Sequence, residues 1–419
     1  MDKTAIIGFG RAGHAAAVSM RESGYAGEIH VFVSDNNGPA NPMLTTYYAS
    51  GKMDRAGLFP FGNLDDIADA LNLKVHKDVK VSRLDADQRE VFWNDQSACY
   101  DNIIIATGAI PILPLEENQA SNRVIAVRTI QDAEQMLTTL HQTKKVLVVG
   151  ASMVGIKVIQ ALTERGIDAT LADLGTVVFP TAVLSGADQI LEKRILEQGV
   201  TLRLGISVNA LKEEEQQVVV TFSDGEKDSY DGVFFCIGTR AEVSLAKTAG
   251  IAVERGILVD ERMRTNKSGI YAVGDCCQTY EWSTNSDRNV GLWANAAMQG
   301  SVAGQNIAGQ PAEYAGNLIC NITHFWNTDF VSVGNNKADG AVVSYYSLDG
   351  WSIHVLSRDG KPQCVNIIDN LKLSGVIKNY MMKKFRVADA QFDIQAMYYI
   401  QQFGLPEEII DALGGNQDD

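Results

Sequence analysis

The chain has 419 residues, of which 46% are hydrophobic, enough for two or three domains with substantial cores. Its formal net charge of −15 argues against nucleic acid or an anionic membrane as the main partner. The six cysteines show neither a disulfide framework nor the spacing of paired C-x-x-C metal sites, so we expect a reducing, cytoplasmic location and no bound metal. Apolar runs are too short to cross a bilayer, and strand-like sequence begins near residue 4, so we expect no secretory leader.

The first 35 residues have the order of a dinucleotide-binding βαβ unit. Residues 5–8 form a short apolar run, 15–22 an Ala-rich helical pattern, and 29–33 a second apolar run that is followed by Asp35. A G-x-G-x-x-G motif at residues 8–13 connects the first run to the helix. The order strand, glycine turn, helix, strand and acid predicts a nucleotide site, although a glycine turn alone is also common in ordinary packing.

Each glycine of this motif has a distinct predicted role. Gly8 permits a tight turn, Gly10 lets a pyrophosphate approach the backbone, and Gly13 allows close packing of helix on strand. The helix N-terminus then offers free N–H groups and a positive dipole end to the diphosphate. Asp35 is placed to accept hydrogen bonds from a ribose hydroxyl.

The stretch that follows leads out of this first unit. Residues 36–57 are rich in turn-forming residues and precede a predicted helix, and 73–93 alternates apolar and polar residues as a strand pair would. Residues 100–108 form an apolar strand that ends on a small-residue turn. Pro111 and Pro114 mark a predicted crossing into a second domain.

Residues 144–173 repeat the βαβ pattern. Their motif, at residues 150–155, is G-x-S-x-x-G, in which Ser152 replaces the second glycine. Asp173 ends the second strand, and residues 174–179 contain no Arg or Lys that could bind a 2′-phosphate, which favours NADH over NADPH. The alternative is an ordinary packing turn.

The rest of the central region predicts small strands and one helix. Residues 199–236 suggest an antiparallel meander. Asp275 follows a strand and a glycine, where an acid can meet a cofactor, and residues 292–309 form a small-residue helix suited to packing on a flat ligand.

The segment from about residue 311 has a different character. Residues 342–377 predict about four alternating strands, with Asp-Gly hairpin turns at 349–350 and 359–360. A helical, acidic tail is predicted from residue 390.

In this order the motifs GFGRAG, IIIATG, GASMVG and GIYAVGD resemble the two-dinucleotide-binding-domain flavoproteins of the pyridine nucleotide-disulfide oxidoreductase superfamily. The resemblance implies an α/β fold with two Rossmann-like domains, one for FAD and one for NAD(P)H, and a C-terminal α+β domain. The implied boundaries are 1–110 and 236–310 for the FAD domain, 111–235 for the NAD(P)H domain, and 311–419 for the C-terminal domain.

The resemblance also implies the residues that hold the two cofactors. The implied FAD residues are Gly8, Gly10, Ala12, Gly13, Asp35, Val81, Thr107, Gly108, Asp275 and Trp293. The implied NADH residues are Gly150, Ser152, Val154, Gly155, Asp173 and Gly238. For Trp293, stacking on the isoalloxazine ring stands beside plain core packing, the commoner use of an aromatic residue.

The chain departs from this superfamily in two ways. Disulfide reductases carry a redox cysteine in the segment after the first βαβ unit, whereas residues 39–52 contain none. The proline-rich segment, the helix that begins at 292–300 and the C-terminal strands instead resemble the rubredoxin and ferredoxin reductases and nitrite-reductase flavin domains. Lys157 stands where many relatives have a Glu. As a catalytic residue it could stabilise reduced flavin or an anionic substrate; otherwise it is a solvated or ion-paired helix residue. Lys52 is a second cationic candidate.

Several other possible site residues can each be interpreted in two ways. Cys276 and Cys277 could be redox-active, but small apolar packing is the expected use. Tyr47 and Tyr48 could shape an acceptor site, and His324 could act as an acid or base, although a half-buried strand histidine is the usual case.

A basic run near the C-terminus could dock an acidic electron carrier such as a ferredoxin or rubredoxin, or be a solvated helix face. Its residues are Lys372, Lys378, Lys383, Lys384 and Arg386. A homodimer through the C-terminal strands is also open.

The favoured function is FAD-dependent NAD(P)H oxidoreduction, in which NADH gives hydride to FAD and electrons pass to a rubredoxin- or ferredoxin-type carrier. The alternatives are a flavoenzyme that uses a small organic substrate or O₂, as an NADH oxidase does, and a flavoprotein subunit or redox-sensing module without turnover.

Overall fold

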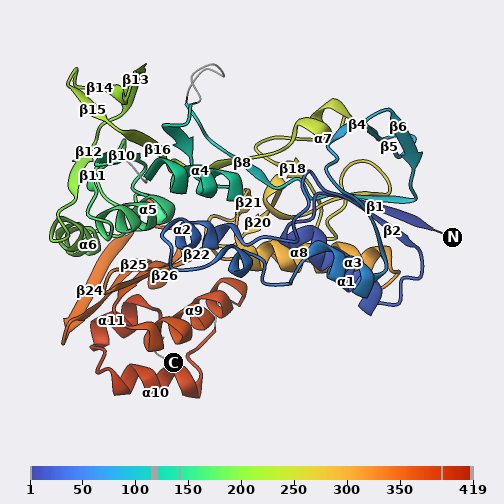
Figure 1. The fold of residues 1–419 in the computed structure, drawn as a ribbon. Coiled ribbons are helices and arrows are strands. Elements are labelled where there is room, and N and C mark those ends of the chain that lie inside the picture. The colour runs from blue at the N-terminus through green and yellow to red at the C-terminus, as the bar shows by residue number, and fades with distance from the viewer. Residues whose placement is uncertain (1, 115–120, 141–142, 388–389, 416–419) are drawn as a thin grey trace. The chain divides into compact units, whose positions relative to one another are not determined.

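The computed structural model describes residues 2–114, 121–140, 143–387 and 390–415, which divide into two compact units (Figure 1). The first unit comprises Met1–Ile110, Thr239–Glu281 and Asn285–Asn317. The second comprises Pro111–Gly238, Trp282–Thr284 and Leu318–Asp419.

A five-stranded parallel sheet forms the centre of the first unit. Its strand order is β19-β7-β1-β2-β3, so β1 lies in the middle. Four of the five residues of β1 are buried, because helices and loops cover both faces of a parallel sheet. The strands are β1 (Lys3–Ile7), β2 (Glu28–Phe32), β3 (Leu73–His76), β7 (Asn102–Ile105) and β19 (Ile270–Ala272).

Two helices of the first unit, α1 (Arg11–Glu22) and α8 (Trp293–Ile307), lie side by side (Figure 1). A Cβ added to Gly300 would come closer than 3.0 Å to the carbonyl oxygen of Ala12, and one added to Gly304 would lie 2.6 Å from that of Ala16. The small residues predicted in α8 therefore pack against the backbone of α1.

Shorter elements complete the first unit. The predicted strand pair at 73–93 is wrong in part, because β3 joins the parallel sheet while β4 and β5 form an antiparallel sheet with β6. The helical elements are η1 (Pro42–Leu44), α2 (Thr45–Ala49), η2 (Arg55–Leu58), α3 (Leu64–Leu71), α7 (Ser244–Thr248) and η4 (Gly274–Cys276). The strands are β4 (Val81–Asp85), β5 (Glu90–Trp93), β6 (Gln96–Cys99), β8 (Ala109–Pro111), β17 (Thr239–Ala241), β18 (Ile257–Leu258), β20 (Cys277–Glu281) and β21 (Ser286–Arg288).

The second unit also contains a five-stranded parallel sheet, with strand order β12-β11-β10-β16-β9. Its strands are β9 (Val124–Ala126), β10 (Lys145–Val149), β11 (Asp168–Asp173), β12 (Thr201–Leu204) and β16 (Gly232–Phe235). The helices in the same part of this unit are α4 (Ile130–Leu140), α5 (Met153–Thr163) and α6 (Ala187–Leu196).

The predicted meander at 199–236 is shorter than expected. Only β13 (Val208–Glu214), β14 (Gln217–Phe222) and β15 (Lys227–Tyr230) form it. Strands of the meander and of the parallel sheet differ in burial. The meander strand β14 alternates between buried and more exposed residues, whereas all four residues of β16 are buried in the parallel sheet.

The C-terminal part of the second unit is a five-stranded antiparallel sheet with strand order β22-β23-β26-β25-β24. Helices cover one face of it (Figure 1), with Leu373 and Ile377 packing against Ile353 and Ile367. The strands are β22 (Cys320–Phe325), β23 (Thr328–Gly334), β24 (Val342–Leu348), β25 (Trp351–Arg358) and β26 (Lys361–Ile368). The helices are α9 (Leu371–Arg386), α10 (Ile394–Gln402) and α11 (Glu407–Ala412).

Both predicted Asp-Gly hairpin turns are confirmed, since Asp349 and Gly350 have φ of 46° and 87°, and Asp359 and Gly360 have φ of 50° and 67°. The prediction of about four strands in 342–377 is wrong. Three strands form there, and α9 begins at Leu371, where the Asn370 side chain accepts a hydrogen bond from the Leu373 N–H at 3.1 Å.

Candidate functional site

The three glycines of the first loop have different surroundings: two are packed against backbone, and one faces open space. Gly8 has φ of +94°, and a Cβ there would come closer than 3.0 Å to the carbonyl oxygen of Ala106. A Cβ at Gly13 would collide in the same way with the carbonyl oxygen of Gly8. A Cβ at Gly10 would meet no atom within 4 Å. The fold thus requires Gly8 and Gly13, whereas the open space at Gly10 fits a ligand that approaches the backbone.

The start of α1 is suited to an anion. Gly10 caps this helix without a side-chain hydrogen bond, and its first turn contains no acid. The N–H groups of the first turn and the positive dipole end therefore face the open side of the loop without an acidic side chain. Ala12 is buried against α8.

Polar atoms around the helix starts also lack partners. The Nε of Arg11 and the Nδ2 of Asn295 are buried without a hydrogen bond, and the Asn295 side chain lies in the first turn of α8 with 4% of the residue exposed. Unsatisfied buried donors are costly, so they fit a site that a polar ligand completes. Neither residue was predicted as a site residue, although Arg11 is a basic side chain inside the glycine motif with no acid beside it.

Asp35 and Val81 lie at the end of the first sheet and in the small antiparallel sheet. Asp35 is half-buried three residues after β2, and its Oδ1 accepts a hydrogen bond from the Asn37 N–H at 2.8 Å. Val81 opens β4 and is 9% exposed. The ribose contact of Asp35 and the FAD contact of Val81 remain predictions.

Thr107 and Gly108 are bound to the segment that returns after residue 238. The Thr107 hydroxyl donates to the carbonyl oxygen of Glu242 at 2.7 Å, and the carbonyl oxygen of Gly108 accepts from the Glu242 N–H at 2.9 Å. Gly108 has φ of +71°, which only glycine adopts easily. These bonds hold the turn after β7 in place.

Asp275 lies in η4, directly after the edge strand β19. Asn289 donates from Nδ2 to the carbonyl oxygens of Asp275 and Cys277, at 2.7 and 2.9 Å. A Cβ at Gly291 would lie 3.3 Å from Oδ2 of Asp275, so the side chain contacts the segment that leads into α8. Trp293 begins α8 and lies parallel to Phe61, with ring centroids 6.2 Å apart.

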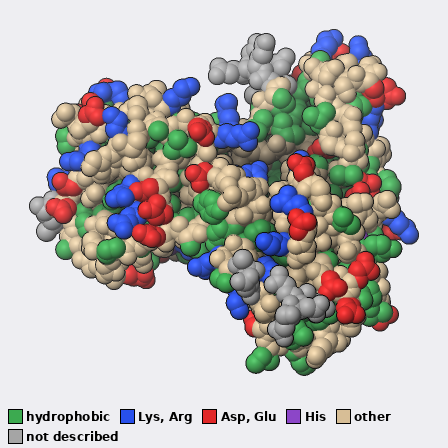
Figure 2. All heavy atoms as spheres, turned by 180° about the vertical axis from the view of Figure 1, so that it is seen from behind, with side chains coloured by type: hydrophobic (Ala, Val, Ile, Leu, Met, Phe, Trp, Pro, Cys, Tyr) green, Lys and Arg blue, Asp and Glu red, His purple; other side chains and the backbone are tan. Residues whose placement is uncertain are grey.

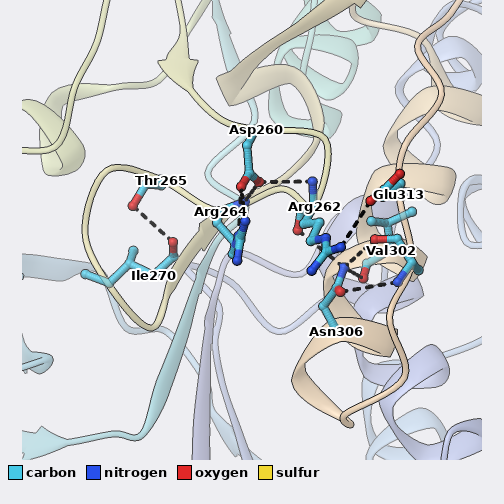
Figure 3. Close-up of polar contacts among 9 residues, drawn as sticks. Asp260, Arg262, Arg264, Thr265, Ile270, Val302, Asn306 and Glu313 are labelled. Carbon is cyan, nitrogen blue, oxygen red and sulfur yellow. Dashed lines mark hydrogen bonds and ion pairs between the residues drawn. The ribbon is translucent and has the colours of Figure 1, made fainter.

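A polar network ties the segment before β19 to α8 (Figure 3). Asp260 accepts hydrogen bonds from the N–H groups of Arg262 and Arg264 and from Nε of Arg264, the last at 2.7 Å. Burial opposes ionisation, but these hydrogen bonds lower the pKa of Asp260. Asn306 of α8 donates to the carbonyl oxygens of Val302 at 2.9 Å and Arg262 at 3.5 Å. The network holds α8 beside the segment that leads into β19.

In the second glycine loop, as in the first, two glycines lie against backbone carbonyl oxygens. Gly150 has φ of +114°, and a Cβ there would lie 2.5 Å from the carbonyl oxygen of Cys236. A Cβ at Gly155 would collide with the carbonyl oxygen of Gly150. Ser152 caps α5: its hydroxyl accepts from the Gly155 N–H at 3.2 Å and donates to the carbonyl oxygen of Cys236 at 2.8 Å. The replacement of glycine by Ser152 is therefore accommodated by hydrogen bonds.

The carboxylate of Asp173 is hydrogen-bonded to this loop and to the turn after β11. Its Oδ2 accepts from the Ala151 N–H and its Oδ1 from the Gly175 N–H, both at 2.6 Å. Val154 is 40% exposed, and Gly238, with φ of +99°, faces open space. The loop thus offers exposed positions for a pyridine nucleotide, while the ribose contact of Asp173 remains a prediction.

The two cationic candidates lie in different units. Lys157 of α5 donates from Nζ to the carbonyl oxygen of His324 in β22, and His324 Nδ1 lies 2.7 Å from Asp329 Oδ1. This contact joins the parallel sheet region to the C-terminal sheet. Lys52 is exposed, beyond α2, the helix that carries Tyr47 and Tyr48. The catalytic roles of both lysines remain predictions.

Cys276 and Cys277 are buried thiols within the first unit. Cys276 Sγ lies 3.2 Å from the carbonyl oxygen of Val273, and Cys277 Sγ lies 3.3 Å from that of Gly274. Burial raises the pKa of Cys276 to about 11. All six cysteines of the chain are free thiols. The geometry fits the packing interpretation of the pair.

The predicted basic docking run needs one correction. Lys384 is only 7% exposed, and its ammonium donates to the carbonyl oxygens of Ala390 at 3.1 Å and Gly414 at 3.4 Å, so it cannot belong to a docking surface. The Arg386 guanidinium lies 5.7 Å from the ring centre of Trp282. Lys372 and Lys383 are exposed. On the face drawn in Figure 2, acidic and basic side chains are interspersed.

No helix in the described part of the chain is long and apolar enough to span a membrane. The described residues also contain no group of three or more His, Cys, Asp or Glu side chains that could hold a metal ion.

Comparisons with known proteins agree with the two glycine loops. Residues 2–300 match the family described as pyridine nucleotide-disulphide oxidoreductase. An NADH oxidase of Methanocaldococcus jannaschii is 28% identical over 317 residues, which cover 74% of this chain and 70% of that protein. A rubredoxin-NAD(+) reductase of Alcanivorax borkumensis is 28% identical over 280 residues, covering 66% of this chain and 73% of that protein.

The fold is likewise shared with a solved structure. The water-forming NADH oxidase of Lactobacillus brevis, bound to NADH, superposes with a TM-score of 0.84 at 20% identity, over 98% of this chain and all of that chain. The family match spans more than half of the sequence and includes both glycine loops. The chain therefore belongs to the pyridine nucleotide-disulphide oxidoreductase family, and it is an oxidoreductase that uses FAD and a pyridine nucleotide.

Proposed function

We propose that the protein oxidises NADH through bound FAD and passes the electrons to a small carrier protein of the rubredoxin or ferredoxin type. The observation that carries this proposal is the pair of glycine loops, each at the carboxyl end of a central strand in its own parallel sheet. When bound, the two cofactors supply the hydride and electron transfer. The protein binds and orients them.

The assignment of the loops follows the chain order of the resemblance. The first loop, with Asp35, Thr107, Gly108 and Asp275, would hold FAD within residues 1–110 and 236–310. The second loop would hold the pyridine nucleotide within residues 111–235, followed by a C-terminal domain from residue 311. Asp173, with no Arg or Lys at 174–179, favours NADH.

The absence of a cysteine from residues 39–52 supports a one-electron carrier over a disulfide substrate. The A. borkumensis relative is named for a rubredoxin, which supports the same carrier class. For docking we propose the basic face of α9, now limited to Lys372, Lys378, Lys383 and Arg386. The free state of all six thiols supports a reducing, cytoplasmic location, and a homodimer through the C-terminal sheet is part of the proposal.

Reduction of O₂ is the second candidate, because the M. jannaschii relative is named an NADH oxidase. In that case Lys157 and Lys52 would be the cationic side chains that favour a negatively charged product or reduced flavin. The two candidates share the NADH half-reaction and differ only in the acceptor.

The first experiment is an anaerobic titration of the FAD-loaded protein with NADH and NADPH, with the flavin absorbance band as readout. We expect stoichiometric bleaching by NADH and slower bleaching by NADPH. If neither nucleotide bleaches the band, the proposed electron entry is wrong.

The second experiment mixes the reduced protein with rubredoxin, ferredoxin or O₂ and measures the rate of reoxidation. A carrier that outpaces O₂ supports the first candidate; O₂ as the fastest acceptor supports the second. Lys372→Gln should lower the rate of reoxidation by the carrier and should make this rate less dependent on salt. Lys212→Gln, an exposed change on β13, is the matched control.

A further inference from the structure

Arg11 is a cation without an anionic partner beside the first glycine loop. It is the first residue of α1, and its guanidinium carbon lies 4.8 Å from the ring centre of Phe61. Its Nη1 lies 3.4 Å from Nδ1 of His14, and its Nε is buried without a hydrogen bond. Across the described residues, no carboxylate comes within 4.0 Å of this guanidinium.

Its position is electrostatically unfavourable without a ligand. The positive end of the α1 dipole lies at the same place, and the first turn contains no acid. Burial lowers the pKa of Arg11, which means that the surroundings disfavour its charge. His14, whose pKa burial and Arg11 lower to about 4, is neutral near pH 7 and supplies no negative charge.

Phe61 holds the guanidinium in place. Its ring stacks on the imidazole of His14, with centroids 4.4 Å apart and planes 23° apart, and lies parallel to Trp293 at 6.2 Å. The attraction between a cation and an aromatic face is stronger where water is excluded. The ring therefore orients the Arg11 guanidinium without neutralising its charge.

We propose that Arg11 is a direct ligand of the FAD diphosphate. The proposal rests on the assignment of the first loop to FAD. A planar guanidinium can donate two parallel hydrogen bonds to phosphate oxygens, which would satisfy the unpartnered Nε. The diphosphate supplies the negative charge that the start of α1 lacks, beside the open space at Gly10.

The test uses the full chain with FAD removed and titrated back, following flavin fluorescence at low and high salt. We expect Arg11→Gln to weaken FAD binding by about ten- to a hundredfold, because a hydrogen-bonded charge is lost. The salt dependence of binding should also fall. The thermal midpoint should drop for the FAD-saturated variant but stay level or rise for the apo-variant, which loses an uncompensated cation.

Arg83→Gln is the matched control, because the Arg83 guanidinium also lies over an aromatic ring, that of Phe92, at 3.4 Å on an exposed strand position. It should leave FAD affinity unchanged. Arg11→Lys, which keeps the charge but not the planar fork, should bind FAD with intermediate affinity and keep the salt dependence. This variant carries the test if the Gln variant does not fold.

Two results would overturn the assignment of Arg11. One is FAD affinity within twofold of the wild type in Arg11→Gln or Arg11→Lys. The other is an equal loss of midpoint in the apo and FAD-saturated states, which would mark Arg11 as a structural residue only. If the wild-type chain binds no FAD, the proposed function itself fails, and the proposal for Arg11 fails with it.

Discussion

The first glycine loop predicts opposite effects for two alanine substitutions three residues apart. Gly10→Ala adds a methyl group that meets no atom within 4 Å, at a residue with φ of −74° and ψ of −160° that alanine also adopts. The apo-protein should keep its stability or gain up to about 1 kcal/mol, because alanine restricts the unfolded chain. Binding of FAD should weaken about tenfold or more, because the methyl group takes the space of the diphosphate.

Gly13→Ala should instead damage the fold. Its methyl group would collide with the carbonyl oxygen of Gly8 and lie 3.1 Å from Cγ2 of Ile6, so helix and strand must separate. Overpacking lowers the free energy of unfolding by about 1–3 kcal/mol, and the higher helix propensity of alanine offsets up to about 1 kcal/mol of this loss. We expect a net loss of about 1–2 kcal/mol in the free energy of unfolding.

The assay is urea unfolding of both apo-variants, followed by circular dichroism, together with titration of each with FAD. Midpoints are compared rather than extrapolated free energies, because two compact units need not unfold in one step. The reasoning is refuted if Gly10→Ala lowers the apo midpoint as much as Gly13→Ala does. Wild-type FAD affinity in Gly10→Ala would refute it equally.

Three further predictions concern single side chains. His14, with a folded pKa of about 4 against an ordinary 6.5, binds its proton less readily in the folded state, so stability should fall as the pH drops from about 6.5 to 4. The loss is on the order of 3 kcal/mol, and His14→Gln should flatten the curve of unfolding midpoint against pH. Ser152→Ala removes the cap of α5 and should cost about 1 kcal/mol, measured by urea unfolding. The control is Ser207→Ala, a half-buried serine outside any helix whose hydroxyl donates to Oδ1 of Asn209. Iodoacetamide at pH 8 should label exposed Cys99 well before Cys276 by peptide mass analysis; equal rates would contradict the burial argument.

Local patterns were enough for much of the fold. Both βαβ units follow from apolar runs, glycine spacing and a terminal acid, which are features of continuous stretches of chain. The Asp-Gly turns at 349–350 and 359–360 were predicted for the same reason, because a two-residue hairpin selects residues that tolerate positive φ.

The errors arose where a local pattern fits two structures. Residues 371–377 alternate over a short window like a strand, but apolar residues recur at Leu373, Ile377, Tyr380 and Met381 with the period of a helix. The strands β12 and β16 could not be told from the neighbouring meander, because short apolar runs occur in both kinds of sheet.

By itself the sequence determined the two nucleotide-binding units, their order and the family resemblance, since these depend on residues close together in the chain. Only the tertiary structure decided why Gly8 must be glycine, through the approach of Ala106, and that Lys157 binds the carbonyl oxygen of His324. It also buried Lys384 and left Arg11 without an anionic partner among the described residues. Burial and charge pairing depend on segments far apart in sequence, so no local pattern could reveal them.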